Sequence, residues 1–487
     1  MDQGSDKHAK LARKLIEDSK ECGWLEFKVN NGDPKEIGSY ISALSNSAAL
    51  ASKHHGYLIW GVEDQTRRIT GTTFNPLTSK VGNEDLIPWL QRLVTPKTKF
   101  DFIPVVVDGQ NLVMMAVERA HRQPTQFEGQ EFIRVGSTKK PLKAAPELEA
   151  ELWRIFEQTQ YEGELAATGL SESEVISLLD YPAYFQLSEI PLPEGRSQIL
   201  RQLLNEQLIV EEETGDYAVT NLGAILFARD LTSFPKLARK AVRVVLYDGG
   251  NRVITKREQG GVRGYAAGFE NLISFINNLV PNNEVMGTAL RKSVPMYPTL
   301  TVRELAANAL IHQDFRVGGA GPLIEIFDDR MEISNPGTPL VEIDRLMDTP
   351  PRSRNERLAS LLRRFGMCEE RGSGIDKVVF EAEFYQLPPP DFRIVGDNTV
   401  AVLYAPQKLT AMQPKDRIRA CYQHACLMYV SNKTATNASV RKRFKIEDQN
   451  HAMASRIIKE TLEAGLIRKS NPDSDSKRHA SYWPFWA

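Results

Sequence analysis

Cysteine is scarce in this sequence, with four residues in a chain of 487, and no two of them form a Cys-x-x-Cys pair. Such scattered thiols argue against a disulfide framework or a zinc site, and they suit a reducing cytoplasm. Long apolar runs are also missing, because no segment reaches the ~18 uncharged apolar residues that span a bilayer. The opening MDQGSDKHAKLARKL lacks the apolar core of a secretion signal. We therefore expect a cytoplasmic protein without a membrane partner.

A third absence concerns nucleotide motifs. No Gly-x-x-x-x-Gly-Lys-Ser/Thr segment occurs in the chain, which argues against a P-loop helicase motor. What is present is ordinary for a globular protein, with 41% hydrophobic and 25% charged residues. This length is sufficient for about three or four domains.

Charge is distributed unevenly along the chain. The whole sequence has 61 Lys and Arg against 62 Asp and Glu, a net charge of −1. Residues 410–487 hold 14 Lys and Arg but only 7 Asp and Glu, so this tail carries +7 and the remainder −8. A basic module on an acidic body predicts a polyanion partner for the tail alone. A solvated basic surface is the alternative.

Apolar patterns predict a multidomain α/β (α+β) protein. Short apolar runs at 56–62, 102–107 and 111–117 are typical of strands, with DGQ (108–110) as a hairpin turn between the last two. Runs at 323–328 and 399–405 predict a second sheet. The predicted parts are a mixed α/β domain at 1–145, a winged-helix-like connector at 146–234 that contains a helix, a two-stranded turn and a helix in this order, a second α/β domain at 235–408 and a tail of helices and a wing at 409–487.

The segment ELAANALIHQD, residues 304–314, combines apolar and polar residues in a regular pattern. In a helix, Glu304, Asn308 and His312 would form one polar stripe with apolar neighbours on either side. An amide oxygen such as that of Asn308 is a suitable ligand for Mg²⁺, and a carboxylate one turn away can orient or deprotonate water. A satisfied polar seam between helix and sheet is the alternative.

Further motifs follow this stripe in a recognisable order. NALIHQDF (308–315), Asn-Pro-Gly (335–337) and ERGSGI (370–375) resemble the ATP-binding fold of gyrase-type ATPases, heat-shock-90 chaperones and histidine kinases. The variant they resemble belongs to a bacterial family of transcriptional regulators, also described as divergent AAA-type proteins.

This resemblance implies ATP and Mg²⁺ as cofactors. Asn308 would bind Mg²⁺, Glu304 would activate the attacking water, and the Gly-Ser-Gly turn would seat phosphate at a helix start. The wider superfamily holds the adenine amino group with an Asp, whereas Asn335 occupies that region here, a departure that bears on nucleotide choice. The implied cofactor-binding residues are Asn308, His312, Asn335, Gly337, Gly372 and Gly374.

Three other stretches resemble the Schlafen-type AlbA_2 domain: ECGWLEFK (21–28), GYLIWGVEDQTRRITG (56–71) and FIRVGS (132–137). The family's AFANTxGG is degraded here to ALSNSAALASKHHG. In Schlafen nucleases two Glu and one Asp form a metal-dependent RNA-cleaving site. The matching residues are Glu21, Glu26 and Asp64, which would bind Mg²⁺ or Mn²⁺ and activate water.

Nucleic-acid binding without cleavage is a second hypothesis for this domain. Its phosphate contacts would come from Lys28, Arg134, Lys139 and Lys140. A structural role is a third, because Glu26 and Lys28 point to the same strand face and can pair as ions.

The tail resembles a winged helix-turn-helix. Its recognition helix is predicted at 450–464 and ends at Gly465. Such a helix fits the major groove of duplex DNA. The predicted nucleic-acid contacts are Arg441, Arg443, Arg456, Lys459, Lys477 and Arg478. A winged helix that contacts protein is the alternative.

These parts together predict an ATP-binding, DNA-binding regulator whose nucleotide state controls nucleic-acid binding. The rival hypothesis is a metal-dependent nuclease acting on RNA, tRNA or DNA, and a weaker one is an assembling scaffold. A homo-oligomer is expected, because such regulators usually read two half-sites.

Overall fold

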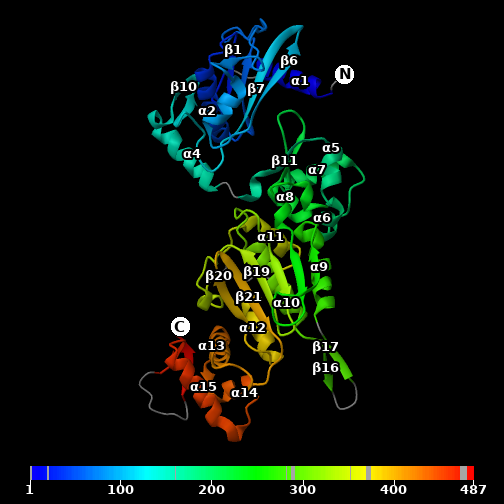
Figure 1. Ribbon diagram of the computed structural model, residues 1–487, viewed down its shortest axis with the longest axis vertical. Helices are drawn as coiled ribbons and strands as arrows, with labels where there is room; N and C mark the ends of the chain where they lie inside the picture. Colours follow the sequence, from blue (N-terminus) through cyan, green and yellow to red (C-terminus); the bar gives the residue numbers. More distant parts are fainter. Residues whose placement is uncertain are drawn as a thin grey trace. The chain divides into compact units, whose positions relative to one another are not determined.

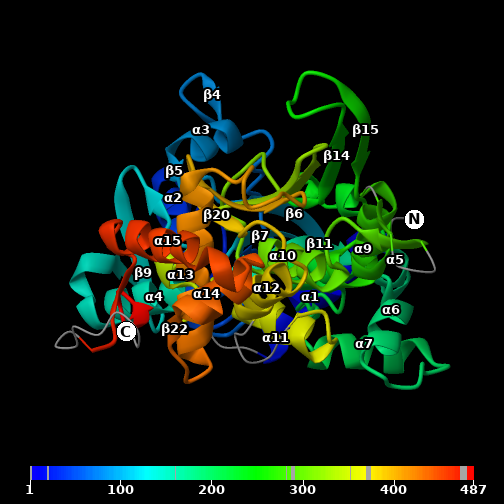
Figure 2. The same cartoon turned by 90° about the horizontal axis from the view of Figure 1, so that it is seen from below.

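The computed structural model describes residues 3–18, 21–158, 161–280, 282–286, 291–350, 352–368, 374–471 and 480–487. The chain separates into two compact units, and each is described by itself. The first comprises residues 1–164 with the short segments 168–171 and 210–218, and the second comprises the remainder. Figures 1 and 2 show the elements of both.

A four-stranded sheet forms the centre of the first unit, in the order β1-β2-β7-β6. Strands β1 and β2 are parallel and the other pairs are antiparallel. The strands are β1 Leu25–Lys28, β2 His55–Trp60, β6 Phe100–Val107 and β7 Gln110–Glu118. The predicted hairpin between β6 and β7 turns at Asp108 and Gly109, which both have positive φ (51° and 75°), as a tight two-residue hairpin requires.

Two helices cover this sheet on opposite faces. Apolar side chains of α2 (Pro34–Leu50) pack with Leu58 and Trp60, whereas those of α1 (Gln3–Asp18) pack with Tyr57 and Ile59. Successive side chains of β2 therefore point to opposite faces of the sheet, as the pleat of a strand requires. A second sheet, ordered β10-β9-β8-β5, lies beside α2. The remaining elements are β3 Lys80–Val81, β4 Glu84–Asp85, α3 Leu86–Leu93, β5 Val94–Thr95, β8 Gln126–Phe127, β9 Gln130–Val135, β10 Thr138–Pro141 and α4 Pro146–Gln158.

Asn46, in the degraded AlbA_2 motif on α2, ties these layers together. It is fully buried, and its Nδ2 donates to the carbonyl oxygens of Thr125 (3.0 Å) and Phe132 (2.9 Å). Its Oδ1 accepts from the Thr125 N–H at 2.7 Å. One amide thus satisfies three backbone groups, two of them on the fully buried Thr125.

The connector is divided between the two units: residues 168–171 and 210–218 belong to the first, whereas helices α5 to α8 belong to the second. Its elements are β11 Leu165–Leu170, α5 Glu172–Leu178, α6 Tyr181–Leu187, α7 Arg196–Asn205, β12 Ile209–Glu211, β13 Tyr217–Thr220 and α8 Asn221–Phe227. The order helix, two strands, helix from α7 to α8 is the one expected from the sequence.

A six-stranded sheet, ordered β15-β14-β18-β19-β21-β20, organises the second unit. Strands β14 and β18 are parallel and the others antiparallel. Helix α10 packs against β19 and lies between α9 and α12 (Figure 1). The β14–β15 hairpin extends from the sheet in Figure 2. The elements are β14 Arg243–Tyr247, β15 Thr255–Gly260, α9 Tyr265–Leu279, β16 Asn282–Met286, β17 Arg291–Pro295, α10 Thr299–Ile311, β18 Leu323–Ile326, β19 Arg330–Pro336, α11 Glu356–Arg364, α12 Gly374–Phe384, β20 Asp391–Val395 and β21 Asn398–Tyr404.

The tail folds around its own apolar core, which joins α13, α14 and α15. Its small sheet has the order β22-β24-β23. The elements are α13 Pro414–Val430, β22 Ala435–Thr436, α14 Asn437–Phe444, α15 His451–Glu463, β23 Ile467–Lys469 and β24 Ser481–Pro484. Throughout the described ranges, every helix is too short or too polar to cross a bilayer.

Replacing Asn46 by Ala should destabilise the first unit by at least ~2 kcal/mol, because each buried group left unsatisfied costs about 1–3 kcal/mol. Hydrogen exchange of peptides covering 125–132 measures the effect. The exposed Asn111→Ala serves as control, and equal exchange in both variants would contradict the role assigned to Asn46.

Candidate nucleotide and nucleic-acid sites

A cavity of about 720 Å³ lies between α10, β19 and α11 in the second unit. This volume is typical of a site for a small organic ligand or cofactor. The sequence-predicted residues that line it are Glu304, Asn308, His312, Asn335 and Gly374. Gly337 lies close by on the β19 exit, and Gly372 falls outside the described residues.

Helix α12 starts against the polar stripe of α10. A Cβ atom on Gly374 would lie 2.7 Å from Glu304 Oε2 and 3.9 Å from Asn308 Nδ2. A side chain at position 374 would require the Glu304 carboxylate to shift. Glu304 is 5% exposed, and the positive end of the α12 dipole favours its charge there. A carboxylate, an amide and a helix start therefore converge at one end of the cavity.

His312 marks the other end of the stripe. It is the C-cap residue of α10, and its backbone N–H donates to Asn308 O at 2.9 Å. Burial lowers the pKa of His312, and the positive charge of Arg354 lowers it further. The imidazole is consequently neutral at neutral pH. Gly337 has φ +99° and leaves space beside Asp314 and Arg354, because a Cβ there would lie 2.9 Å from Asp314 Cβ.

The structure adds residues that the sequence patterns did not single out. Asn355 is buried, and its Nδ2 donates to Ile311 O and Gln313 O at 2.8 Å each. This side chain fastens the segment before α11 to the end of α10. Three arginines also line the cavity: Arg352 and Arg354 before α11, and Arg363 within it. Their clustering in RSRNERLASLLRR was the available signal for a polyanion site.

In the first unit, Glu26 is held in a buried charge cluster. It is 2% exposed and forms ion pairs with Lys28 and Arg134. Tyr40 Oη donates to Glu26 Oε1 at 3.2 Å. Arg134 also donates to Leu25 O at 3.1 Å. Two cations thus neutralise Glu26 inside the fold.

This cluster corrects the expectation that Arg134 contacts phosphate. Its side chain is fully buried between β9 and β1, so it cannot reach a polyanion from this position. Lys139 is engaged in part, because its Nζ donates to Glu36 Oε2 at 3.0 Å and lies 4.3 Å from the centre of the Tyr40 ring. Lys140 is exposed.

Glu21 lies beside this cluster, and the pKa of its carboxyl group is raised. Burial raises the pKa of Glu21 to about 7, with further increases from Glu26 and Asp64. The Phe27 N–H donates to its Oε1 at 2.9 Å and opposes this rise, as does Arg134. A carboxyl group with a pKa near 7 can donate or accept a proton at neutral pH.

The predicted metal role of Glu21, Glu26 and Asp64 finds no support in this geometry. Within the described ranges, no three His, Cys, Asp or Glu side chains are grouped to hold a metal ion. The carboxylate of Glu26 is already paired with Lys28 and Arg134, so this donor set does not suit Mg²⁺ or Mn²⁺ without rearrangement. The metal-ligand assignment stays a prediction.

The tail presents some of its predicted contacts and buries one. Arg456 and Lys459 are 80% and 75% exposed on α15, each beside a glutamate one turn on. Arg441 pairs with Asp448. Arg443 is buried against Glu383 and Leu387, which corrects its assignment as a phosphate contact. Lys477 and Arg478 lie outside the described residues.

Two segments match known families. Residues 21–143 match the family "Schlafen, AlbA_2", and residues 319–403 match HATPase_c_4, described as "Putative ATP-dependent DNA helicase recG C-terminal". No curated protein matches the chain. Among solved structures, it is similar to the DIP2311 protein from Corynebacterium diphtheriae, at 17% identity and a TM-score of 0.42 over 98% of this chain and 97% of that one. The chain therefore carries an AlbA_2 domain and an ATPase-like domain, which indicate a nucleic-acid-related, ATP-binding protein.

The raised pKa of Glu21 predicts a pH dependence. A carboxyl group with a pKa of 4.5 when unfolded and about 7 when folded stabilises the first unit below pH 4.5, and this stabilisation is lost as the pH rises to 7. Glu21→Gln removes the titration, so its melting temperature relative to wild type should rise between pH 4.5 and 7 and then level off. Thermal melting across this range checks it, with exposed Glu128→Gln as control. A constant difference would contradict the shift.

Proposed function

We propose that this protein is an ATP-responsive regulator whose nucleotide state controls nucleic-acid binding by a winged-helix tail. The observation that carries the proposal is the course of helix α12. The helix begins at Gly374, beside Glu304 and Asn308 in the cavity, and ends next to the tail. A single rigid element thus contacts both modules.

Glu383, near the end of α12, connects to two helices of the tail. His424 Nδ1 on α13 lies 3.0 Å from Glu383 Oε2, and Arg443 Nε on α14 lies 3.5 Å from Glu383 Oε1. Arg443 also donates to Leu387 O at 2.9 Å. These groups are buried or nearly so, and a buried charge must keep its partners. A displacement of α12 would consequently move the tail helices with it.

Further contacts hold the tail against the ATPase-like domain. Gln423 Nε2 donates to Pro390 O at 2.8 Å, and Arg419 pairs with Asp391 at 3.2 Å. Both partners lie just after α12, between that helix and the start of β20. The orientation of α15, and of Arg456 upon it, therefore depends on the ATPase-like domain.

The donor set of the cavity suits a nucleotide with Mg²⁺. Asn308 would hold Mg²⁺ through its amide oxygen, and the bound ion would supply positive charge for the phosphate oxygens. Glu304 would orient or deprotonate the attacking water, while the N-terminus of α12 and the arginines of the 352–363 segment would balance phosphate charge. Neutral His312 would accept or donate one hydrogen bond without adding charge.

A Schlafen-like nuclease is the second candidate function. It is favoured by the AlbA_2 match and by Glu21, whose pKa of about 7 suits general acid–base chemistry on RNA, tRNA or DNA, including foreign nucleic acid. Pairing of Glu26 with Lys28 and Arg134 favours binding over cleavage.

Asn308→Ala should abolish stabilisation of the second unit by Mg²⁺-ATP. At ATP near 100 Kd, the wild type should gain about 2.7 kcal/mol, seen as a raised melting temperature. Asn278→Ala on the exposed side of α9 is the control. If neither ATP nor another nucleotide raises the melting temperature of the wild type, the polar stripe is structural and nucleotide does not regulate the protein.

Glu383→Gln should uncouple DNA affinity from ATP. The wild type should bind duplex DNA with a steep salt dependence, which the double change Arg456→Glu, Lys459→Glu should reduce in the full chain. ATP should alter this affinity in the wild type and in Glu381→Gln, a control two residues earlier on α12, but not in Glu383→Gln. Fluorescence anisotropy with labelled DNA measures all four proteins, and an unchanged ATP response in Glu383→Gln would refute the connection through α12.

A further inference from the structure

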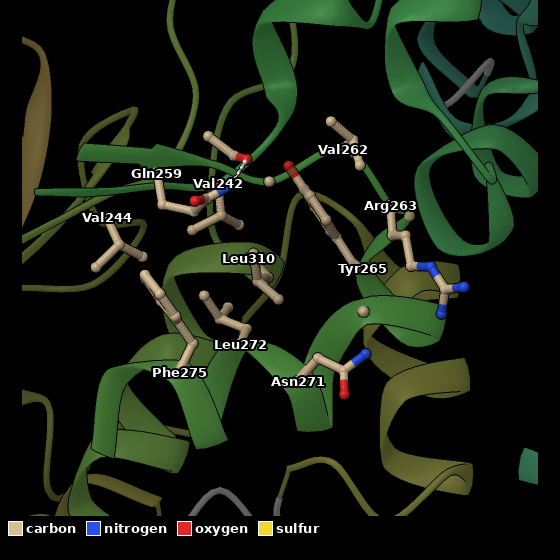
Figure 3. A pocket seen from close by; sticks show the side chains of 14 residues that line it. Val242, Val244, Gln259, Val262, Arg263, Tyr265, Asn271, Leu272, Phe275 and Leu310 are labelled. Atoms are coloured by element: carbon tan, nitrogen blue, oxygen red, sulfur yellow. Dashed lines mark hydrogen bonds between the residues drawn. The ribbon is translucent and has the colours of Figure 1, made fainter. Parts of the chain in front are cut away.

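The second unit contains a further, smaller cavity of about 230 Å³ between α9 and the β14–β15 side of its sheet (Figure 3). Its lining is largely apolar and includes Phe275 of α9 and Leu310 of α10. In Figure 3 the guanidinium of Arg263 and the amide of Asn271 turn away from this lining, and Arg263 pairs with Asp180 at 3.8 Å. These two polar groups therefore give a ligand no contact inside the cavity.

Three aromatic side chains at the end of α12 are exposed to solvent. Phe380, Phe384 and Tyr385 are 51%, 68% and 48% exposed. The rings of Phe380 and Phe384, one helical turn apart, have their centres 6.2 Å apart and an angle of 21° between their planes. Tyr385 meets Phe384 edge-on, with 5.1 Å between the ring centres. Contiguous exposed aromatic surface is typical of an interaction site.

The tail brings positive charge to this end of α12. Arg443 of α14 pairs with Glu383 and donates to Leu387 O at 2.9 Å, so α14 is fixed where α12 ends. Lys442 and Lys445 flank Arg443 in the sequence and are exposed. The tail as a whole has 14 Lys and Arg against 7 Asp and Glu. Its charge therefore suits a polyanion beside the aromatic rings.

The size of the aromatic surface argues against a second copy of this chain as its partner. A fully covered aromatic side chain buries about 150–250 Å², so the exposed parts of these three rings amount to roughly 300 Å². A stable interface covers about 800 Å² on each partner. The surface is consequently too small to hold a dimer together, although it is large enough for one or two nucleobases.

Aromatic faces next to cations are the combination with which proteins bind single strands, because bases stack on the rings while phosphates meet the positive charges. We propose that Phe380, Phe384 and Tyr385 form a stacking surface for the bases of a single-stranded nucleic acid, whose phosphates contact Lys442 and Lys445. This surface is separate from the exposed residues of α15 to which the duplex contacts were assigned, and it goes beyond the proposed function.

Short fluorescein-labelled oligothymidylate and oligouridylate strands of equal length test the surface on the full chain. An abasic strand of the same length keeps the phosphates but lacks the bases. Fluorescence anisotropy should show about tenfold tighter binding of the thymidylate, the uridylate or both than of the abasic strand, as expected for base–aromatic stacking. The strand that binds more tightly identifies DNA or RNA as the ligand.

Variants at Phe384 separate stacking from other apolar contact. Phe384→Ala should abolish the preference for strands with bases and leave the abasic strand unaffected. Phe384→Trp should retain this preference, whereas Phe384→Leu, which is apolar but has no flat face, should lose it. Lys442→Gln should weaken all strands alike and reduce the salt dependence. Trp153→Ala truncates another exposed ring, on α4 of the first unit (42% exposed), and should bind like the wild type.

Four results would overturn the proposal. These are no binding of any strand at ~100 µM, the weak limit of non-specific binding, equal affinity of the wild type for all strands, a preference that survives in Phe384→Ala, or one that survives in Phe384→Leu. Light scattering that shows a dimer for the wild type and a monomer for Phe384→Ala would assign the surface to a second copy instead.

The test is independent of folding and of the proposed function. Because Phe384 is 68% exposed, its variants should melt at the wild-type temperature, which thermal melting checks. Loss of ATP binding, or of duplex binding through α15, would refute the proposed function and leave the stacking surface intact.

Discussion

The second unit depends on the close approach of helix α12 to helix α10. A glycine at 374 lets the first turn of α12 rest against the Glu304 carboxylate, and the helix dipole stabilises the buried charge that results. This contact places a carboxylate, an amide and a helix start at one cavity. It also fixes the direction of α12, so that its other end meets the tail at Glu383.

Buried charge is handled in the same way in both units. Glu26 is neutralised by Lys28 and Arg134, and Glu383 by His424 and Arg443. Such clusters add little net stability, since desolvation offsets much of the attraction, but losing one partner is costly. They therefore specify how helices and strands meet. The Glu26 cluster fixes the core of the AlbA_2 domain. The Glu383 cluster fixes the tail helices against α12.

Helix α10 contributes residues to both cavities of the second unit. Its polar stripe faces the nucleotide cavity, while Leu310 on another side faces the smaller apolar cavity. Hydrogen bonds through Tyr265, Gln313 and Asn355 extend this connection across the end of the helix. A packed helix of this kind moves as a unit, so two cavities that share it are physically able to influence each other.

Local spacing in the sequence was sufficient to predict the β6–β7 hairpin, helix α10 and the grouping of Glu304 with Asn308, because these depend on neighbours within one or two turns. Asn46 and Asn355 were not predictable, since their partners are backbone groups brought near by folding. The same holds for Arg134 and Arg443. The sequence shows that each arginine is positively charged, but only the tertiary structure decides whether its partner is a phosphate or a glutamate. The glutamate that pairs with Arg134 is over a hundred residues away in the sequence, and the one that pairs with Arg443 lies across a domain boundary.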